Sequence, residues 1–99
     1  MSRYHLIIEE TRTTVTLDTT LSNLLALKLN TDPIADPAAA HAAVRGWLQG
    51  EIDRDPRAYV LARRKVTNRN SQRLQKFALL AVAAPHLVRR LDECEVENG

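Results

Sequence analysis

The feature that most constrains this chain is a short alternating stretch, residues 12–17, that runs directly into a helix start signal. In an extended strand, positions 13, 15 and 17 share one largely apolar face, and positions 12, 14 and 16 share a polar face. Asp18 or Thr19 then supplies an N-cap, and the apolar spacing from Leu21 to Leu29 is typical of a short amphipathic helix. The sequence therefore predicts a half-buried strand followed at once by a helix.

Residues 4–8 are rich in β-formers and also look extended. The linker that follows, residues 9–11, lacks the Gly, Asn or Pro that tight hairpin turns favour. The sequence thus does not predict a hairpin between the two extended stretches, and whether residues 4–8 extend a ribbon stays open.

Proline and aspartate divide the rest of the chain. The first helix ends before Pro33, because a residue that precedes proline is pushed out of the helical region. Asp36 and Pro37 predict the start of a second helix over 38–52. Residues 57–66 suggest a short helix and residues 72–83 a longer one, which Pro85 ends or kinks. We expect the acidic residues 92–99 to be disordered.

A single strand is unstable by itself, because it has two open edges and almost no core behind it. Two copies that pair their strands antiparallel would remove both problems, with four helices covering the apolar face of the ribbon. The sequence then predicts a mainly α fold with one short β-strand. We expect a homodimerisation domain over 1–55 and a helical or partly disordered extension over 56–99.

The order strand–helix–helix, with the strand reading Arg12-x-Thr14-x-Thr16-Leu17, resembles the ribbon-helix-helix repressors over residues 11–54. The resemblance implies an intertwined homodimer whose two-stranded ribbon enters the major groove, where Arg12, Thr14 and Thr16 contact bases. The inward residues and the helix stripes would form the dimer core, made of Val15, Leu17, Leu21, Leu24, Leu25, Val44, Trp47 and Leu48.

Charge is distributed unevenly along the chain. Residues 1–55 carry five Lys or Arg and eight Asp or Glu, residues 56–91 carry nine Lys or Arg and no Asp or Glu, and the last eight residues carry four acidic side chains. A long stretch without acidic residues favours an acidic partner, nucleic acid first. We expect phosphate contacts from Arg63, Arg64, Lys65 and Arg69, although a merely solvated helix face would explain the same run.

Other functional classes find little support in the sequence. The three histidines are far apart and form no metal-ligand spacing with Cys94, so we expect no metal site, no cofactor and no enzyme activity. No apolar run approaches the roughly 18 residues of a membrane span. The chain opens on Arg3-Tyr4-His5 without an apolar leader, and we expect a cytoplasmic protein that does not engage a membrane.

Together with this resemblance, the sequence predicts a sequence-specific transcriptional repressor that binds a palindromic operator as a homodimer. The resemblance further suggests a plasmid-maintenance regulator, or an autoregulating antitoxin whose C-terminal half binds a toxin protein. Two alternatives stay open. One is a protein-interaction module that does not bind DNA, and the other is a non-specific nucleic-acid binder that works through the basic segment alone.

Overall fold

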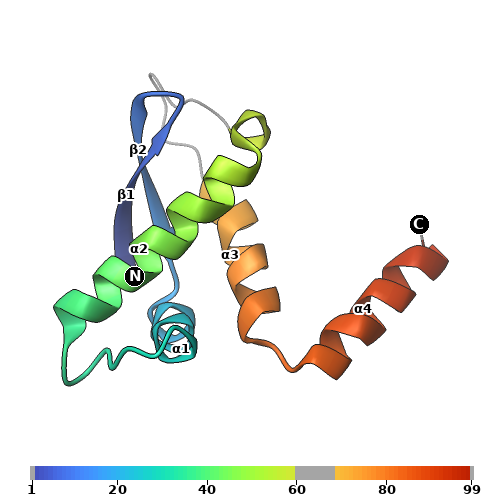
Figure 1. Cartoon of the computed structure of the whole chain (residues 1–99). Helices are drawn as coiled ribbons and strands as arrows, with labels where there is room; N and C mark the ends of the chain where they lie inside the picture. Colours follow the sequence, from blue (N-terminus) through green and yellow to red (C-terminus); the bar gives the residue numbers. More distant parts are fainter. Residues whose placement is uncertain (1, 60–68, 99) are drawn as a thin grey trace.

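A computed structural model describes residues 2–59 and 69–98 of the chain. Two strands, β1 (Ser2–Ile8) and β2 (Thr11–Leu17), precede the helices α1 (Thr19–Lys28) and α2 (Pro37–Arg54), the 3-10 turn η1 (Pro56–Ala58), and the helices α3 (Arg69–Val82) and α4 (Pro85–Asn98) (Figure 1). The predicted mainly helical class, with a strand leading into helices, is confirmed. The prediction of only one strand is wrong.

The second strand is β1, which pairs with β2 as an antiparallel hairpin in which Ile8 lies opposite Thr11 and Ser2 opposite Leu17. Only Glu9 and Glu10 remain for the turn, with φ angles of 47° and 68°. Two successive positive φ angles are the backbone of a type I′ turn, which suits the twist of a hairpin. The ribbon that the sequence assigned to two copies is therefore formed within one chain. A second copy is not needed to pair β2.

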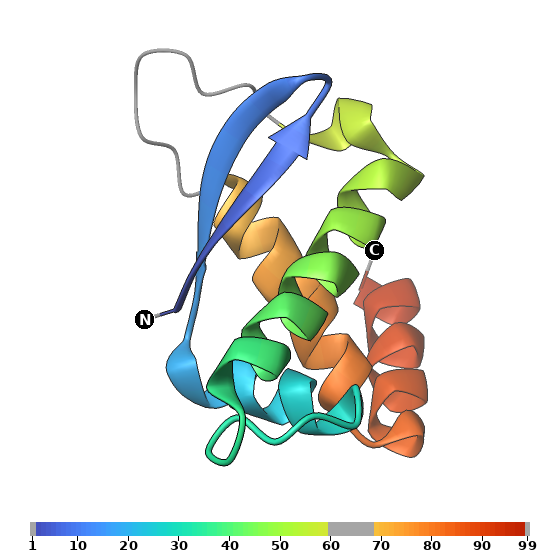
Figure 2. The ribbon, with the colours of Figure 1, turned by 60° about the vertical axis from the view of Figure 1, so that its left-hand side comes forward.

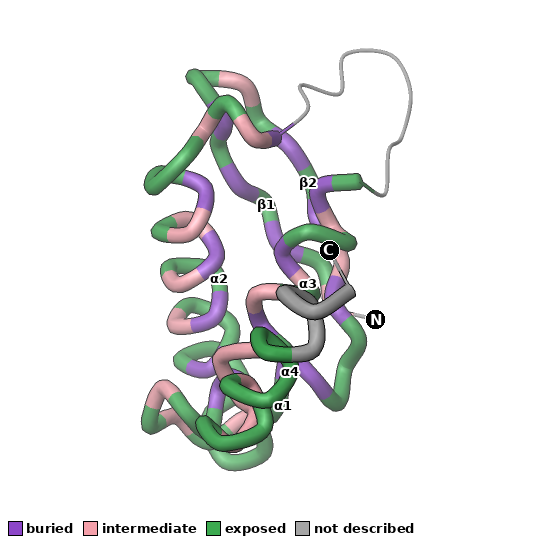
Figure 3. Tube along the Cα trace, turned by 90° about the vertical axis from the view of Figure 1, so that its right-hand side faces the viewer, coloured by how far each residue is buried: buried purple, intermediate pink, exposed green. Residues whose placement is uncertain are grey.

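The inner face of the hairpin closes the hydrophobic core. Buried and exposed residues alternate along both strands, as Figure 3 shows. Tyr4, Leu6 and Ile8 are the buried residues of β1, and positions 13, 15 and 17 are those of β2, as predicted. Helices α1, α2 and α3 complete the core with Leu21, Leu25, Ala26, Ala40, Val44, Leu48, Ile52, Leu74 and Ala78. The core thus draws residues from both sides of the predicted boundary at position 55.

Six of the eight residues predicted for a dimer core are buried inside this single chain: Val15, Leu17, Leu21, Leu25, Val44 and Leu48. Trp47 is only partly buried and packs at the margin of the core. Leu24 is 48% exposed within this chain, and its place in a dimer core stays a prediction. The buried face of α1 includes Ser22, whose hydroxyl hydrogen-bonds with the hydroxyl of Tyr4, and this face turns Leu24 outward.

Both predicted helix starts are present. The Asp18 carboxylate accepts a hydrogen bond from the Leu21 N–H at 3.2 Å, and the Asp36 carboxylate accepts one from the Ala39 N–H at 3.1 Å. Pro37 occupies the first turn of α2. Between the helices, the Asp32 carboxylate accepts hydrogen bonds from two backbone N–H groups, which lower the pKa of Asp32.

The C-terminal region differs from expectation. Pro85 opens α4, which continues to Asn98, so the expected disorder of residues 92–98 is wrong. Proline fits the first position of a helix, and no further Pro or Gly interrupts the sequence before Gly99. Of the short helix predicted over 57–66, residues 57 and 58 lie in η1, and residues 60–66 lie outside the described residues.

The helices α1, α2 and α3 pack on the inner side of the hairpin. Figure 2 shows the hairpin as a twisted ribbon, with α2 to its right, α3 behind α2, and α1 below. Helix α4 stands apart from this body in Figure 1. Among the described residues, no helix has the length and apolarity that crossing a bilayer would require.

Candidate nucleic-acid interface

The outer face of the hairpin is the surface that the sequence assigned to DNA. It consists of three cross-strand pairs: Arg3 with Thr16, His5 with Thr14, and Ile7 with Arg12. All of these side chains are exposed except Thr16, which is half-buried. The structure therefore brings the three predicted base-contacting residues onto one outward face, with Thr16 the least accessible of them.

Thr16 is less accessible because α3 reaches the edge of β2 at this point. The Thr16 backbone N–H donates to the Ser71 hydroxyl oxygen at 3.0 Å, and Ser71 lies in the first turn of α3. This contact satisfies an edge donor that would otherwise be open to another strand.

His5 belongs to the same face, although the sequence did not single it out as a candidate binding residue. Its Nδ1 lies 3.1 Å from the Thr14 hydroxyl oxygen across the ribbon. This hydrogen bond fixes the orientation of the Thr14 side chain. The signal was present in the sequence, because positions 3, 5 and 7 have the opposite parity to the buried Tyr4, Leu6 and Ile8.

Helix α2 runs along the open edge of β1 through side chains spaced one turn apart. The Gln49 amide accepts from the Ile7 N–H at 2.9 Å and donates to the Ile7 carbonyl at 2.8 Å. Arg45 lies one turn before Gln49 on the helix, and His41 lies two turns before it. His41 Nε2 lies 3.0 Å from the Arg3 carbonyl oxygen. Residues spaced by four lie on one side of a helix, so Arg45 is positioned beside β1 between two anchored neighbours.

The Gln49 side-chain amide hydrogen-bonds to both backbone groups of Ile7, as the backbone of a neighbouring strand would. We expect Gln49→Ala to lower the free energy of unfolding by about 1 kcal/mol, the net worth of hydrogen bonds that water can partly replace. Urea denaturation followed by circular dichroism would measure the change. Gln72→Ala, at an exposed position of α3, is the matched control. An equal effect of the two substitutions would contradict a structural role for the Gln49 amide.

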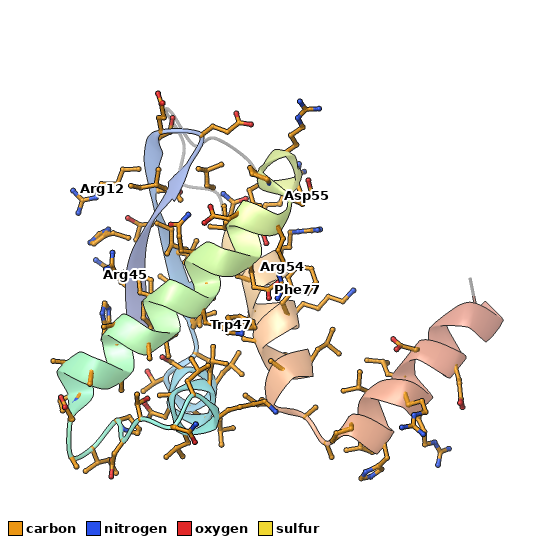
Figure 4. All side chains as sticks on the ribbon, viewed as in Figure 1. Arg12, Arg45, Trp47, Arg54, Asp55 and Phe77 are labelled. Atoms are coloured by element: carbon orange, nitrogen blue, oxygen red, sulfur yellow. The ribbon has the colours of Figure 1, made fainter. Side chains whose placement is uncertain are left out.

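A hollow of about 290 Å³ opens where the hairpin meets α2, lined by His5, Leu6, Ile7, Glu10, Arg12, Arg45 and Gln49. Arg12 and Arg45 come from different elements, yet they project on the same side of the molecule (Figure 4). Within the described part of the chain, the ion pair that forms is Arg54 with Glu51, so neither Arg12 nor Arg45 is neutralised by a carboxylate there. Two guanidinium groups are thus available to an anionic ligand at this hollow, with Glu10 as the acidic residue of its lining.

The phosphate contacts predicted for the basic segment fall only in part on the described residues. Arg63, Arg64 and Lys65 lie outside the described residues. Arg69 is exposed at the start of α3, two residues before Ser71, and therefore lies on the β2 side of the hairpin. It also has contacts within the chain.

Arg73 has a structural role, because it contacts aromatic rings within the chain. Its guanidinium carbon lies 5.4 Å from the centre of the Tyr59 ring and 5.0 Å from that of Phe77, within cation–π range of both. Burial raises the pKa of Tyr59, and the neighbouring Arg73 charge opposes that rise only in part. Arg73 therefore links Tyr59, in the segment after α2, to helix α3.

Comparison of the chain with protein-family models, with curated proteins and with solved structures found no match. The functional argument consequently rests on the geometry of the hairpin face.

Proposed function

We propose that this protein binds double-stranded DNA by placing the outer face of its β-hairpin in the major groove. The observation that carries the proposal is an exposed two-stranded ribbon that presents Arg3, His5, Arg12 and Thr14 together, with Arg45 beside it. The major groove is about 12 Å wide and admits a two-stranded β-ribbon. Arginine and hydroxyl side chains are among the groups that read base edges there.

Each outward side chain has a chemically suitable target. Arg12 donates two hydrogen bonds to O6 and N7 of a guanine, and Thr14 offers a hydroxyl and a methyl group to a neighbouring base. The hydrogen bond between His5 and Thr14 limits the rotation of the Thr14 side chain, which reduces the entropy lost when the contact forms. Ile7, 57% exposed and opposite Arg12, supplies an apolar contact for a thymine methyl group.

Phosphate contacts come from the two sides of the ribbon. Arg45 stands on the β1 side and Arg69 on the β2 side, so both strands of the DNA backbone have a cation next to them. Each phosphate that is neutralised contributes about 0.9 to the slope of log affinity against log salt. This arrangement spreads the charge over the flanks of the ribbon and leaves its centre for base contacts.

The ribbon-helix-helix resemblance is kept here in a modified form. Each chain contributes a complete ribbon of its own, and a palindromic operator would be read by one hairpin in each half-site. A protein bound at an operator blocks polymerase sterically, and we propose repression of transcription as the regulatory outcome.

The decisive experiment compares Arg12→Ala with the wild type by fluorescence anisotropy. The DNA comes from the region upstream of the protein's own gene, and scrambled DNA is the reference. We expect Arg12→Ala to weaken binding to the native DNA by a factor of about 5 to 150, equivalent to about 1–3 kcal/mol, and to leave binding to scrambled DNA nearly unchanged. Lys28→Ala, which removes an exposed cation from α1, is the control.

The same titrations in a salt series examine Arg45. Arg45→Ala should weaken binding to both DNA sequences and reduce the salt slope by about one unit, because a phosphate contact carries no sequence information. If the wild type shows no preference for the native DNA, or Arg12→Ala behaves like Lys28→Ala, base reading by the hairpin is refuted. The protein-interaction and non-specific alternatives would then take its place.

A further inference from the structure

The cross-strand pair of His5 and Thr14 lies in the middle of the outer hairpin face. His5 Nδ1 is 3.1 Å from the Thr14 hydroxyl oxygen, and both side chains are exposed. In the two flanking pairs, the backbone N–H groups of Ile7 and Thr16 donate to side chains outside the hairpin, so these are non-hydrogen-bonded pairs of the ladder. The His5–Thr14 pair belongs to the same set. Side chains approach most closely in such pairs, which explains why the imidazole reaches the hydroxyl.

The protonation state of His5 determines which hydrogen bonds the Thr14 hydroxyl can still form. A positively charged imidazole carries a hydrogen on each nitrogen and has no acceptor, so His5 Nδ1 then donates to the Thr14 oxygen. The hydroxyl hydrogen is left to donate away from the protein. A neutral imidazole has two tautomers. In the tautomer without a hydrogen on Nδ1, the Thr14 hydroxyl donates to His5 and offers only lone pairs to a ligand.

We propose that His5 is a positioning residue whose charge sets the hydrogen-bonding role of Thr14 toward DNA bases. This inference rests on the proposed DNA binding and concerns its base preference. With His5 charged, Thr14 is a donor and favours a base that offers an acceptor in the major groove, such as O6 or N7 of guanine. With His5 neutral, Thr14 serves as donor or acceptor, and the preference relaxes.

Histidine is the side chain that normally changes its charge between about pH 5 and 8, whereas arginine and glutamate keep theirs. The charged and titratable side chains around the hairpin face, within the described residues, come from both strands, the turn, α2 and α3: Arg3, Glu10, Arg12, His41, Arg45 and Arg69. The phosphates of a bound duplex add negative charge on this face, which favours the charged imidazole. Proton uptake by His5 would therefore accompany DNA binding.

Fluorescence anisotropy with the native upstream DNA, from about pH 5.5 to about pH 8 at constant ionic strength, measures the effect on affinity. We expect the affinity of the wild type to fall about tenfold over this range, as one linked proton allows. His5→Asn keeps a polar group near the position of Nδ1 but cannot become charged, and it should remove most of the change. His86→Asn, at an exposed position of α4, is the matched control. The pH dependence should also persist in His41→Asn, which tests the histidine of α2.

Base preference separates the role of Thr14 from a simple effect of charge. The base pair that Thr14 contacts is the one whose replacement no longer changes the affinity of Thr14→Val. At this base pair, we expect the wild type to prefer the acceptor base more strongly at low pH than at high pH. His5→Asn should show the same preference at both ends of the range.

The possible outcomes distinguish this inference from the proposed function. A wild type without preference for the native DNA would refute base reading by the hairpin, and this inference with it. Selective binding with an unchanged base preference across the pH range would overturn the role of His5 alone. A pH dependence that Thr14→Val retains in full would also overturn it, because the charge of His5 would then act on a phosphate directly.

Both side chains are exposed, so we expect each variant to keep the fold. Circular dichroism at both ends of the pH range verifies this, and His5→Gln provides a second variant without a titratable ring. A pH dependence that both substitutions of His5 leave unchanged would overturn the proposal.

Discussion

Replacing Leu25 by alanine should lower the free energy of unfolding by about 2–5 kcal/mol, whereas the same change at the neighbouring Leu24 should cost about 1 kcal/mol or less. Leu25 is fully buried in the core beneath the hairpin, and Leu24 is 48% exposed. Truncating Leu25 removes apolar burial and leaves a cavity, because the surrounding strands and helices relax only in part. Truncating Leu24 removes less buried apolar surface, because about half of its side chain already faces water.

The pair of substitutions is closely matched, since both replace leucine by alanine in the middle of α1. Urea denaturation followed by circular dichroism yields both free energies, and an unchanged m-value would show that the unfolding transition itself is the same. Equal losses at the two positions would mean that α1 faces the core differently. The wild type and both variants should be measured at several protein concentrations, because self-association would stabilise the folded state.

Several elements could be predicted because they depend on short-range geometry. The faces of β2 follow from the two-residue period of a strand, and the starts of α1 and α2 follow from Asp18 and Asp36. The outward placement of Arg12 and Thr14 was predictable for the same reason. None of these inferences needed to know which segment packs on which.

The hairpin could not be predicted because its turn is decided by long-range pairing. Glu9 and Glu10 have no intrinsic preference for positive φ, and a local signal for the turn is therefore absent. Burial of Tyr4, Leu6 and Ile8 against the helices stabilises β1 in register with β2, and the turn adopts the conformation that this register requires. Exposed Ile7 obscured the alternation of β1, because an apolar residue stands on its polar face.

Arg45 could not be assigned to the interface from sequence for a similar reason. Its role depends on α2 running along the edge of β1, which is fixed by the contacts of His41 and Gln49 with the strand backbone. The sequence instead directed attention to the basic run after position 56. In that run, Arg73 proves to be engaged with two aromatic rings.

The second large expected effect on the free energy of unfolding comes from the turn between β1 and β2. Replacing Glu9 by asparagine and Glu10 by glycine should raise the free energy of unfolding by about 2 kcal/mol. A left-handed conformation costs a residue such as glutamate roughly 1–2 kcal/mol, and both turn residues adopt it. Asn-Gly is the dipeptide that type I′ turns prefer, so the double substitution relieves this strain without touching the core.

Removing two carboxylates also changes the charge at the tip of the ribbon, so E9Q/E10Q is the matched control. Glutamine retains the size and backbone preference of glutamate, and this control should therefore leave the stability nearly unchanged. Thermal and urea denaturation of the three proteins would measure the difference. If Asn-Gly gives no more stability than Gln-Gln, then the backbone between Ile8 and Thr11 is not held in a type I′ turn.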